Sequence, residues 1–445
     1  MKRNALFFCD PADWQRVLLG EYALTHTSES ELMIVYDFEH LGEPLLKTFL
    51  RALGVKSKLK KDLLRVFRQS KIRVIKPNLK TIVYSRMQIL NYKELPNYIE
   101  INNPDFSSIY PNLVNITGRL KISVSKYSRA IRQERAKSRG TLLALMQLNF
   151  EGIDQAILVN GRFTKSLTIR HHLNSLNIPL KILEYASTQE KYEVFEIGPH
   201  SNFELGEKMR LAWSAADPGT RDVIASDFFK ILCDRDPSAG VSWTSAMVKN
   251  SVPEIPKDMK ILTFFSSSES EFVGVRDQVS TEEFANQATA LNSLLEITAG
   301  QDWVVYLRRH PKRPDSENLD VEDEIWEQCR MHNHLIEINP FSHVDSFALA
   351  FQSDVVAHYD SSIGPQLIDM GHPRVITLGN TLWSTLDDFH NLRTKQNLRE
   401  YLNNPSDYLP DVRAWAYFRA VYGKTIQNFV LDRKHMSWRL IKSNQ

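Results

Sequence analysis

The feature that most constrains this chain is a repeated alternation of short, wholly apolar runs with stretches of helical periodicity. The runs MIVY (33–36), AILV (156–159) and VVYL (304–307) contain β-branched and aromatic residues with no polar alternation. Strands that are buried on both faces of a parallel sheet have this composition. The alternation therefore predicts βαβ units and the α/β class, with doubly wound, Rossmann-like sheets.

Twelve strands and six helices follow from this pattern. The predicted strands are 5–9, 32–36, 72–75, 81–84, 155–159, 180–183, 193–197, 260–265, 303–307, 335–338, 355–358 and 374–378. The predicted helices are 43–53, 58–68, 166–176, 281–298, 344–351 and 365–370, and residues 411–438 are also expected to be helical. We detect no internal repeat and no low-complexity tract.

The length of 445 residues predicts two domains, since single cores stop growing near ~250–300 residues. Residues 236–258 hold three prolines and no clear strand, so we place the linker there. The expected domains are 1–235 and 259–410. A helical segment, 411–445, is long enough to pack back across both domains.

Several protein classes are excluded or disfavoured by composition. No apolar run reaches the ~18 residues of a membrane span. The first apolar stretch has about five residues, against the roughly 7–15 of a signal peptide, so we expect no signal peptide. Three scattered cysteines indicate a reducing compartment, and we expect a cytoplasmic protein in which Cys9 is a buried apolar residue.

The net charge of +2 conceals a division between the two ends of the chain. Residues 1–150 carry 25 Lys and Arg against 13 Asp and Glu, whereas the remainder carries 30 against 40. Within the basic part, 58–68 reads KLKKDLLRVFR and predicts an amphipathic helix. This helix has two interpretations. Either it contacts a partner, which would be an anionic membrane surface or an acidic acceptor, or it packs into the core with a solvated basic side. No nucleic-acid-binding motif accompanies it, so we expect no nucleic-acid partner.

Polar residues follow three predicted strands of the second half at the point where each strand ends. Ligands of open α/β sheets bind outside the carboxyl ends of the strands. Hydroxyls and backbone amides at a helix N-terminus, together with His and Arg, can hold a phosphate. The alternative for the serine pair is a simple N-cap. The residues concerned are Ser266, Ser267, Ser268, Arg308, His310, Asp360, Ser361 and Ser362.

These segments, SSxxE, RxHP and DSSxGxQLxxMGxPxVI, resemble the nucleotide-binding half of bacterial GT-B glycosyltransferases of capsule and surface polysaccharide. The block NGR…E of the first half, with Asn160, Gly161, Arg162 and Glu184, looks like a block of the same proteins. The resemblance covers about 155–378. It implies two Rossmann-like domains that face a central cleft, with the nucleotide-sugar donor in the second.

The resemblance also implies roles for single residues. The donor would be bound by Ser266, Ser267, Arg308, His310, Asp360, Ser361 and Ser362. His310 and Arg308 would offset the charge on the leaving phosphate. Asn160 and Arg162 would contact the acceptor.

An inverting transfer also needs a general base from the first domain. We favour Glu184, with Asp10 and Glu196 as alternatives. A structural ion pair between Arg162 and Glu184 is an equally good interpretation of that pair. A retaining transfer would need no such base.

The expected function is a glycosyltransferase that moves a sugar from a nucleotide donor to a surface polysaccharide or glycolipid acceptor, without a metal or other cofactor. The pattern Asp234-Arg235-Asp236 lies where the first domain passes into the linker, so we interpret it as solvated chain. Similar motifs occur in polyol-phosphate transferases, which makes a CDP-polyol phosphotransferase the alternative enzyme. Gln366 and Asp369 stand in the region where the family often has a Glu. A non-catalytic nucleotide-sugar-binding protein is therefore a further alternative.

Overall fold

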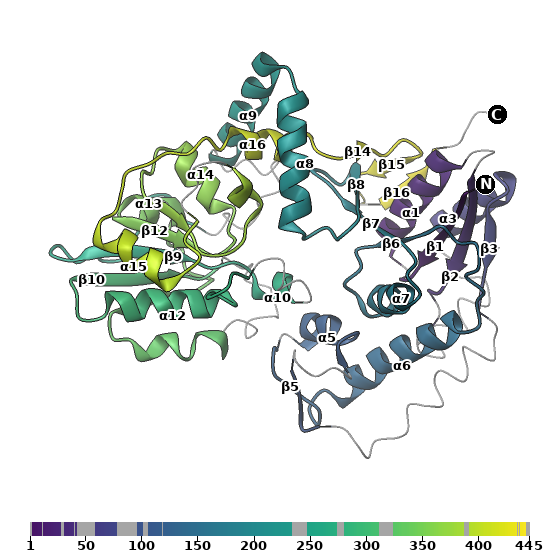
Figure 1. Ribbon diagram of the computed structural model, residues 1–445, viewed down its shortest axis with the longest axis horizontal. Helices are drawn as coiled ribbons and strands as arrows, with labels where there is room; N and C mark the ends of the chain where they lie inside the picture. The colour runs from purple at the N-terminus through teal and green to yellow at the C-terminus, as the bar shows by residue number, and fades with distance from the viewer. Residues whose placement is uncertain are drawn as a thin grey trace. The chain divides into compact units, whose positions relative to one another are not determined.

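The computed structural model describes residues 2–10, 12–27, 31–39, 41, 58–77, 96–100, 106–117, 119–233, 247–273, 280–310, 324–386, 391–433, 435 and 437–441. The chain forms two compact units, of which unit 1 is Met1–Pro199 with Tyr422–Gln445 and unit 2 is His200–Val421. Each contains a largely parallel sheet covered by helices (Figure 1). The predicted α/β class is confirmed.

Unit 1 is built around a seven-stranded sheet. Its strands are β1 (Lys2–Phe8), β2 (Glu31–Asp37), β3 (Arg73–Ile75), β6 (Gln155–Val159), β7 (Leu180–Tyr185), β8 (Lys191–Phe195) and β14 (Lys424–Thr425), in the order β14-β8-β7-β6-β1-β2-β3. The five strands from β7 to β3 are mutually parallel. At the other edge, β8 pairs antiparallel with both β7 and β14.

Helices cover both faces of this sheet, which explains its wholly apolar strands. The helices are α1 (Asp13–His26), α3 (Lys58–Gln69), α5 (Tyr110–Thr117), α6 (Ser128–Leu145) and α7 (Thr164–Ser175). One set of alternate strand residues, including Leu6 and Val35, packs against α1 and α3. The other set, including Phe7 and Tyr36, packs against α6 and α7. Two short strands, β4 (Tyr98–Ile99) and β5 (Ile122–Ser123), pair outside the main sheet.

Unit 2 contains a five-stranded, wholly parallel sheet. Its strands are β9 (Lys260–Phe265), β10 (Trp303–Arg308), β11 (Leu335–Ile338), β12 (Val355–His358) and β13 (Val375–Thr377), in the order β11-β10-β9-β12-β13. All four strand pairings are parallel. If the parallel strands of each unit are numbered 1 to 5 in sequence order, both sheets have the strand order 3-2-1-4-5. This is an arrangement of the doubly wound fold.

The helices of unit 2 bury its sheet on both faces. They are α8 (Asn202–Ala215), α9 (Pro218–Cys233), α10 (Glu269–Phe272), α12 (Gln287–Thr298), α13 (Ser346–Phe351), α14 (Ile363–Asp369), α15 (Lys395–Asn403) and α16 (Arg413–Val421), with 3₁₀ turns η5 (Glu324–Trp326), η6 (Cys329–Met331) and η7 (Leu382–Thr385). The larger cluster joins β9, β10 and β12 to α12 and α15. The smaller one joins Tyr306 and Leu349, which brings α13 onto the opposite face.

The boundary between the units lies earlier than the sequence pattern predicts. We expected the first domain to end at 235, but α8 and α9 group with unit 2. Phe229 of α9 is buried, and its ring lies 5.7 Å from that of Trp415 of α16. The described part of the expected linker, 247–258, also belongs to unit 2, where the Val248 amide donates to the carbonyl of His343. The sequence pattern could not show this contact, because Trp415 comes 186 residues after Phe229 in the chain.

Within its described residues, the C-terminal segment is helical only over α16. The prediction of helix throughout 411–445 is wrong, because β14, β15 (Phe429–Asp432) and β16 (Ser437–Leu440) follow, and the last two form an antiparallel hairpin. Gly423 has a φ of +98°, a conformation that glycine adopts without strain and that ends helices. Beyond it, buried Phe429 and half-buried Leu431 flank the exposed Val430, the period of a strand.

The basic helix α3 packs its apolar side into unit 1. Leu59, Leu63 and Phe67 are at most 5% exposed and belong to the core beside α1. Lys58, Lys61, Arg65 and Arg68 remain exposed on the other side. The interpretation of this helix as core-packing with a solvated basic side is therefore confirmed, and its apolar face is not available for insertion into a membrane.

The predicted strand 81–84, the predicted helix 43–53 and Asp234-Arg235-Asp236 lie outside the described residues. Among the helices that are described, none combines the length and the apolar character required to cross a bilayer.

Candidate functional site

Each parallel sheet has one switch point, where the direction of the strand order reverses. In unit 1 it lies between β1 and β6, and in unit 2 between β9 and β12. The loops after these strands diverge to opposite faces of the sheet, which leaves a crevice for ligands at the carboxyl edge. The serines that follow β9 and β12, and the residues that follow β1 and β6, are therefore at the positions where this fold binds ligands.

The ends of β9 and β10 are joined by a hydrogen bond between two predicted site residues. The backbone amide of His310 donates to Oγ of Ser266 at 2.8 Å. Ser266 is 3% exposed, so this contact fixes the course of the chain after β10 from inside the fold. The imidazole of His310 is half-buried at the same edge. Because β9 lies between β10 and β12, all three predicted strand ends are adjacent.

Ser267 has a fixed backbone and an unsatisfied side chain. Gln287, at the start of α12, accepts from the Ser267 amide at 2.9 Å and donates to the Ser267 carbonyl at 3.1 Å. The hydroxyl of Ser267 is buried and has no hydrogen-bond partner among the described residues. Buried hydroxyls in native proteins are normally paired. The sequence pattern missed Gln287, because its role depends on a contact with a residue 20 positions away.

The serine pair after β12 is held by a buried histidine that the sequence pattern also missed. The amide of Ser361 donates to Nδ1 of His358 at 3.4 Å, and Nε2 of His358 contacts Oγ1 of Thr377 at 3.0 Å. Burial lowers the pKa of His358 to about 3, so its ring is neutral at physiological pH. Ser362 occupies the N-cap position of α14 but makes no side-chain capping bond. The interpretation of the pair as a simple N-cap is therefore not supported.

Arg308 is not placed as a ligand for phosphate. Its guanidinium donates to the carbonyls of Asn339 (2.8 Å) and Ser342 (3.4 Å) and to Oγ of Ser346 (3.3 Å), and the residue is 1% exposed. Burial lowers its pKa to about 10. All three nitrogens are thus used to hold the loop after β11 against the start of α13. We correct its expected role from donor binding to positioning of this edge.

The other residues of this edge have mixed surroundings. Arg309 pairs with Glu337 at 2.9 Å. Asp360 is half-buried before the serine pair. Gln366 donates to the carbonyl of Ser362 at 2.9 Å and so stabilises the first turn of α14, whereas Asp369 is exposed at the end of that helix.

In unit 1 the structure brings Asn160 and Glu184 together. Nδ2 of Asn160, directly after β6, donates to Oε2 of Glu184 on β7 at 2.6 Å. Asn160 has a φ of +62° and Gly161 a φ of +75°, and the Asn160 Oδ1 accepts from the amide of Arg162 at 3.2 Å. Two consecutive left-handed residues make a tight turn that points the Asn160 amide at Glu184. Such strained positions for non-glycine residues occur more often at functional sites.

Burial raises the pKa of Glu184, although the bonds from Asn160 and the Tyr185 amide and the charge of Arg162 partly oppose this. The charge of Arg162 thus acts on Glu184, which accepts a hydrogen bond directly from Asn160. A raised pKa brings a carboxylate closer to the range in which it acts as a base near neutral pH.

The alternative bases have different positions. Asp10 follows β1 at the switch point and accepts from Nε2 of Gln15 at 3.3 Å. Glu196 follows β8, which runs antiparallel to β7, so it lies toward the amino edge of the parallel strands, and it is exposed. Glu196 is therefore wrong as a candidate at the carboxyl edge.

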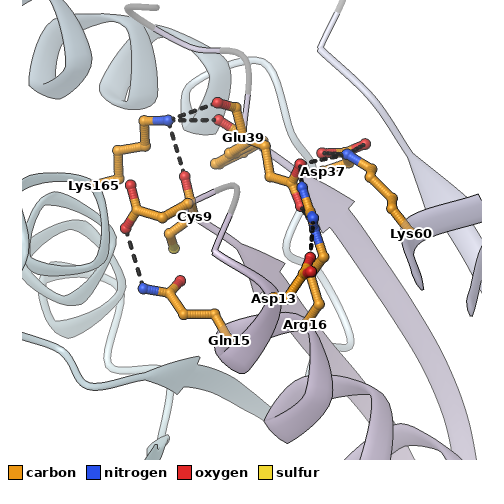
Figure 2. A network of polar contacts seen from close by, with 10 residues as sticks. Cys9, Asp13, Gln15, Arg16, Asp37, Glu39, Lys60 and Lys165 are labelled. Atoms are coloured by element: carbon orange, nitrogen blue, oxygen red, sulfur yellow. Dashed lines mark hydrogen bonds and ion pairs between the residues drawn. The ribbon is translucent and has the colours of Figure 1, made fainter. Parts of the chain in front are cut away.

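A buried lysine organises the switch point of unit 1. Lys165 of α7 is 1% exposed, and its ammonium donates to the carbonyls of Cys9 (2.9 Å), Phe38 (3.2 Å) and Glu39 (2.9 Å) (Figure 2). One cation thus satisfies the carbonyls that follow both β1 and β2. Cys9 itself is buried, as expected, and burial raises the pKa of its thiol.

Beside this lysine lies a buried network of ion pairs (Figure 2). Glu39 receives two parallel bonds of 2.8 Å from Arg16 and one of 2.7 Å from Lys60, and Lys60 also pairs with Asp37 at 2.9 Å. Arg16 in addition contacts Asp13 at 2.6 Å. Lys60 is therefore the one cation of the KLKK sequence that α3 directs into the fold.

Among the described residues, no three His, Cys, Asp or Glu side chains are grouped so that they could hold one metal ion.

No family model and no curated protein matches this sequence. Solved structures that are similar include "Thermosulfurimonas dismutans KpsC, beta Kdo 2,4 transferase", with 11% identity and a TM-score of 0.35 over 61% of this chain and 80% of that chain. They also include a Methanocaldococcus jannaschii UDP-GlcNAc 2-epimerase in complex with UDP-GlcNAc and UDP (11% identity, TM-score 0.27, 93% of this chain and 97% of that one). An E. coli ADP-heptose lps heptosyltransferase II has 9% identity and a TM-score of 0.23 over 91% and 98% of the two chains.

Proposed function

We propose that this protein is a glycosyltransferase that moves a sugar from a nucleotide-activated donor to a hydroxyl of a bacterial surface polysaccharide or glycolipid. The observation that carries the proposal is the hydroxyl of Ser267, which is buried where a doubly wound sheet binds its ligands and is unpaired within the described part of the chain. Ser266 fixes His310 beside it, and Ser361 and Ser362 follow the neighbouring strand. Such a set of hydroxyls and an imidazole suits the phosphates of a nucleotide-sugar.

In the proposed reaction, an acceptor oxygen attacks the anomeric carbon of the donor. The bond from that carbon to the phosphate oxygen breaks, and the nucleotide leaves with the electron pair. In an inverting course, Glu184 takes the proton of the acceptor hydroxyl. Asn160 holds the Glu184 carboxylate in place, and burial makes it more basic than an exposed glutamate.

His310 and the serine hydroxyls stabilise the charge that develops on the departing phosphate. Arg308 acts through the loops that it fixes and touches no reacting atom in this scheme. We expect transfer to proceed without an added divalent metal, which retention of activity in EDTA would test.

Nucleotide binding is the first test. We expect one of CMP, CDP, UDP, GDP and dTDP to raise the melting temperature of the protein, since a ligand that binds only the folded state stabilises it. Ser267→Ala should reduce this shift. Absence of a shift with all five nucleotides would count against the donor site, and a preference for CDP coupled to phosphodiester formation would favour the polyol-phosphate reaction instead.

Turnover is the second test. We expect His310→Ala to lower kcat by roughly 10²–10³-fold, the usual cost of removing one group that stabilises developing charge. The melting temperature should change little, because His310 is half-buried. His332→Ala is the matched control, since His332 precedes β11 at the opposite edge of the sheet and contacts Asn292. Wild-type turnover by His310→Ala would contradict the assignment.

A further inference from the structure

A cavity of about 380 Å³ lies in unit 1 next to Glu184. Three segments that are distant in the sequence form its wall, namely the start of α1, the end of β7 and the hairpin β15–β16. It is lined by Asp13, Trp14, Glu184, Tyr185, Leu431 and Trp438, with Gln189 at its exposed side. The C-terminal hairpin therefore completes a cavity that the first 199 residues alone would leave open.

The apolar part of the wall is a row of three aromatic rings. The rings of Trp14 and Tyr185 have centroids 5.8 Å apart, and those of Tyr185 and Trp438 lie 6.5 Å apart with planes only 16° from parallel. Trp438 is 8% exposed, whereas Trp14 and Tyr185 are half-buried. Rings in such a row offer an extended apolar surface with a polar edge, which suits a ligand with both characters.

The polar part of the wall consists of two carboxylates that already accept hydrogen bonds. Asp13 contacts Arg16 at 2.6 Å, and Glu184 accepts hydrogen bonds from Asn160 and from the Tyr185 amide. Each carboxylate has about four acceptor positions, so both keep capacity for a further hydrogen bond. Arg16 compensates the charge of Asp13, and the charge of Arg162 acts on Glu184. The cavity offers acceptors for neutral hydroxyl groups.

We propose that this cavity binds one sugar ring, which packs its C–H face on Trp14, Tyr185 and Trp438 and donates hydroxyl hydrogen bonds to Asp13 and Glu184. The volume is at the lower end of the range for small-molecule sites, which suits a single ring. The identification of this ring as part of the acceptor rests on the proposed function. The same Glu184 would then hold the hydroxyl that it deprotonates.

Saturation-transfer NMR with the methyl glycosides of glucose, galactose and N-acetylglucosamine tests the proposal on the full chain. We expect at least one glycoside to receive saturation from the wild-type protein. Its affinity should fall about tenfold in Trp14→Ala and in Trp438→Ala, since one aromatic contact is lost. Tyr98→Ala is the matched control, because Tyr98 is a 50% exposed aromatic of the same unit that does not line the cavity.

If a melting curve shows that Trp438→Ala unfolds the hairpin, Trp438→Phe is used in its place. Equal glycoside binding by the wild type and by both tryptophan variants, or no binding by the wild type, would overturn the proposal. Displacement of the glycoside by choline at lower concentration would overturn it in favour of a cation site.

The nucleotide screen separates this inference from the proposed function. If a nucleotide binds and no glycoside does, the cavity proposal fails alone. If a glycoside binds at Trp14 and Trp438 and no nucleotide does, the sugar site stands and the glycosyltransferase proposal fails.

Discussion

Glu39 is a buried charged residue of unit 1 whose stability depends on the cations around it. Its carboxylate is 1% exposed, and an isolated charge at this depth would be expensive. Arg16 and Lys60 compensate it through three hydrogen bonds. Burial alone would raise the pKa of Glu39, but these two cations outweigh burial and hold the pKa below its ordinary value.

A lowered pKa in the folded state predicts acid sensitivity of unit 1. The stabilisation by Glu39 is present above its unfolded pKa, about 4.3, and is lost as the pH falls through the folded pKa. We expect Glu39→Gln to lose about 3–5 kcal/mol of unfolding free energy at pH 7, because Arg16 and Lys60 lose a partner. The variant should also lose less stability than the wild type between pH 5 and pH 3.

Urea unfolding at several pH values, with hydrogen exchange of β1 and β2 as the readout of unit 1, measures both effects. Asp37 and Asp13 face the same two cations and remain in both proteins, so the difference reports on Glu39. Glu151→Gln, an exposed acid of the same unit, is the control. Parallel pH profiles of wild type and Glu39→Gln would contradict the expected linkage.

At the scale of the element, the short helix α14 depends on one close approach. Gly364, its second residue, is buried, and a Cβ there would overlap the imidazole of His358 on β12. The same imidazole accepts from the Ser361 amide and contacts Thr377 on β13. One histidine therefore fixes the distance between α14 and the sheet, and with it the serine pair.

We expect Gly364→Ala to lower the unfolding free energy of unit 2 by about 2 kcal/mol, the cost of overpacking a filled site. It should also weaken binding of whichever nucleotide the screen identifies, because Ser361 moves with the helix. Thermal melts with and without that nucleotide measure both. Gly219→Ala is the control, since its Cβ would meet only ordinary contacts at the start of α9.

A double variant, Gly364→Ala with His358→Ala, tests the cause. The two changes should be less destabilising together than the sum of the single effects, since truncating the imidazole makes room for the new methyl group. If the two losses of stability were strictly additive, overlap with the His358 imidazole would not be the reason that position 364 requires glycine.

At the scale of the whole molecule, unit 1 is discontinuous in sequence. The chain leaves it after Pro199, forms unit 2 and returns at Tyr422. The returning segment contributes Ile426, Phe429 and Trp438 to the core beside α1. Buried Glu21 accepts from the amides of Gln427 and Asn428 at 2.9 and 2.8 Å, which ties the segment to α1.

Truncation after residue 421 should therefore destabilise unit 1 far more than unit 2. Loss of one buried large aromatic costs about 3–5 kcal/mol, and two are removed together with the partner of Glu21. Hydrogen exchange should rise across β1, β6 and α1 while β9 and β12 keep their protection. Truncation after residue 441 is the control, and equal protection of unit 1 in both truncated proteins would contradict the expectation.

The sequence determined the class of fold and the strands of the two parallel sheets. The predicted bounds of β6, β9, β11 and β12 agree with the structure to the residue, because a wholly apolar run between polar turns leaves little freedom to a buried strand. It also placed Ser266 and His310 near one another, since the carboxyl ends of neighbouring parallel strands share an edge.

Only the tertiary structure decided which polar residues remain for a ligand. Arg308 and Arg309 look alike in sequence, yet both are used within the fold by residues 28 to 38 positions away. The pairs of Lys60 and Lys165, the orphaned hydroxyl of Ser267 and the cavity at Trp438 depend on contacts of the same kind. Hydrophobic periodicity is local and is read directly from the chain, whereas the partner of a buried charge is fixed only when distant segments pack together.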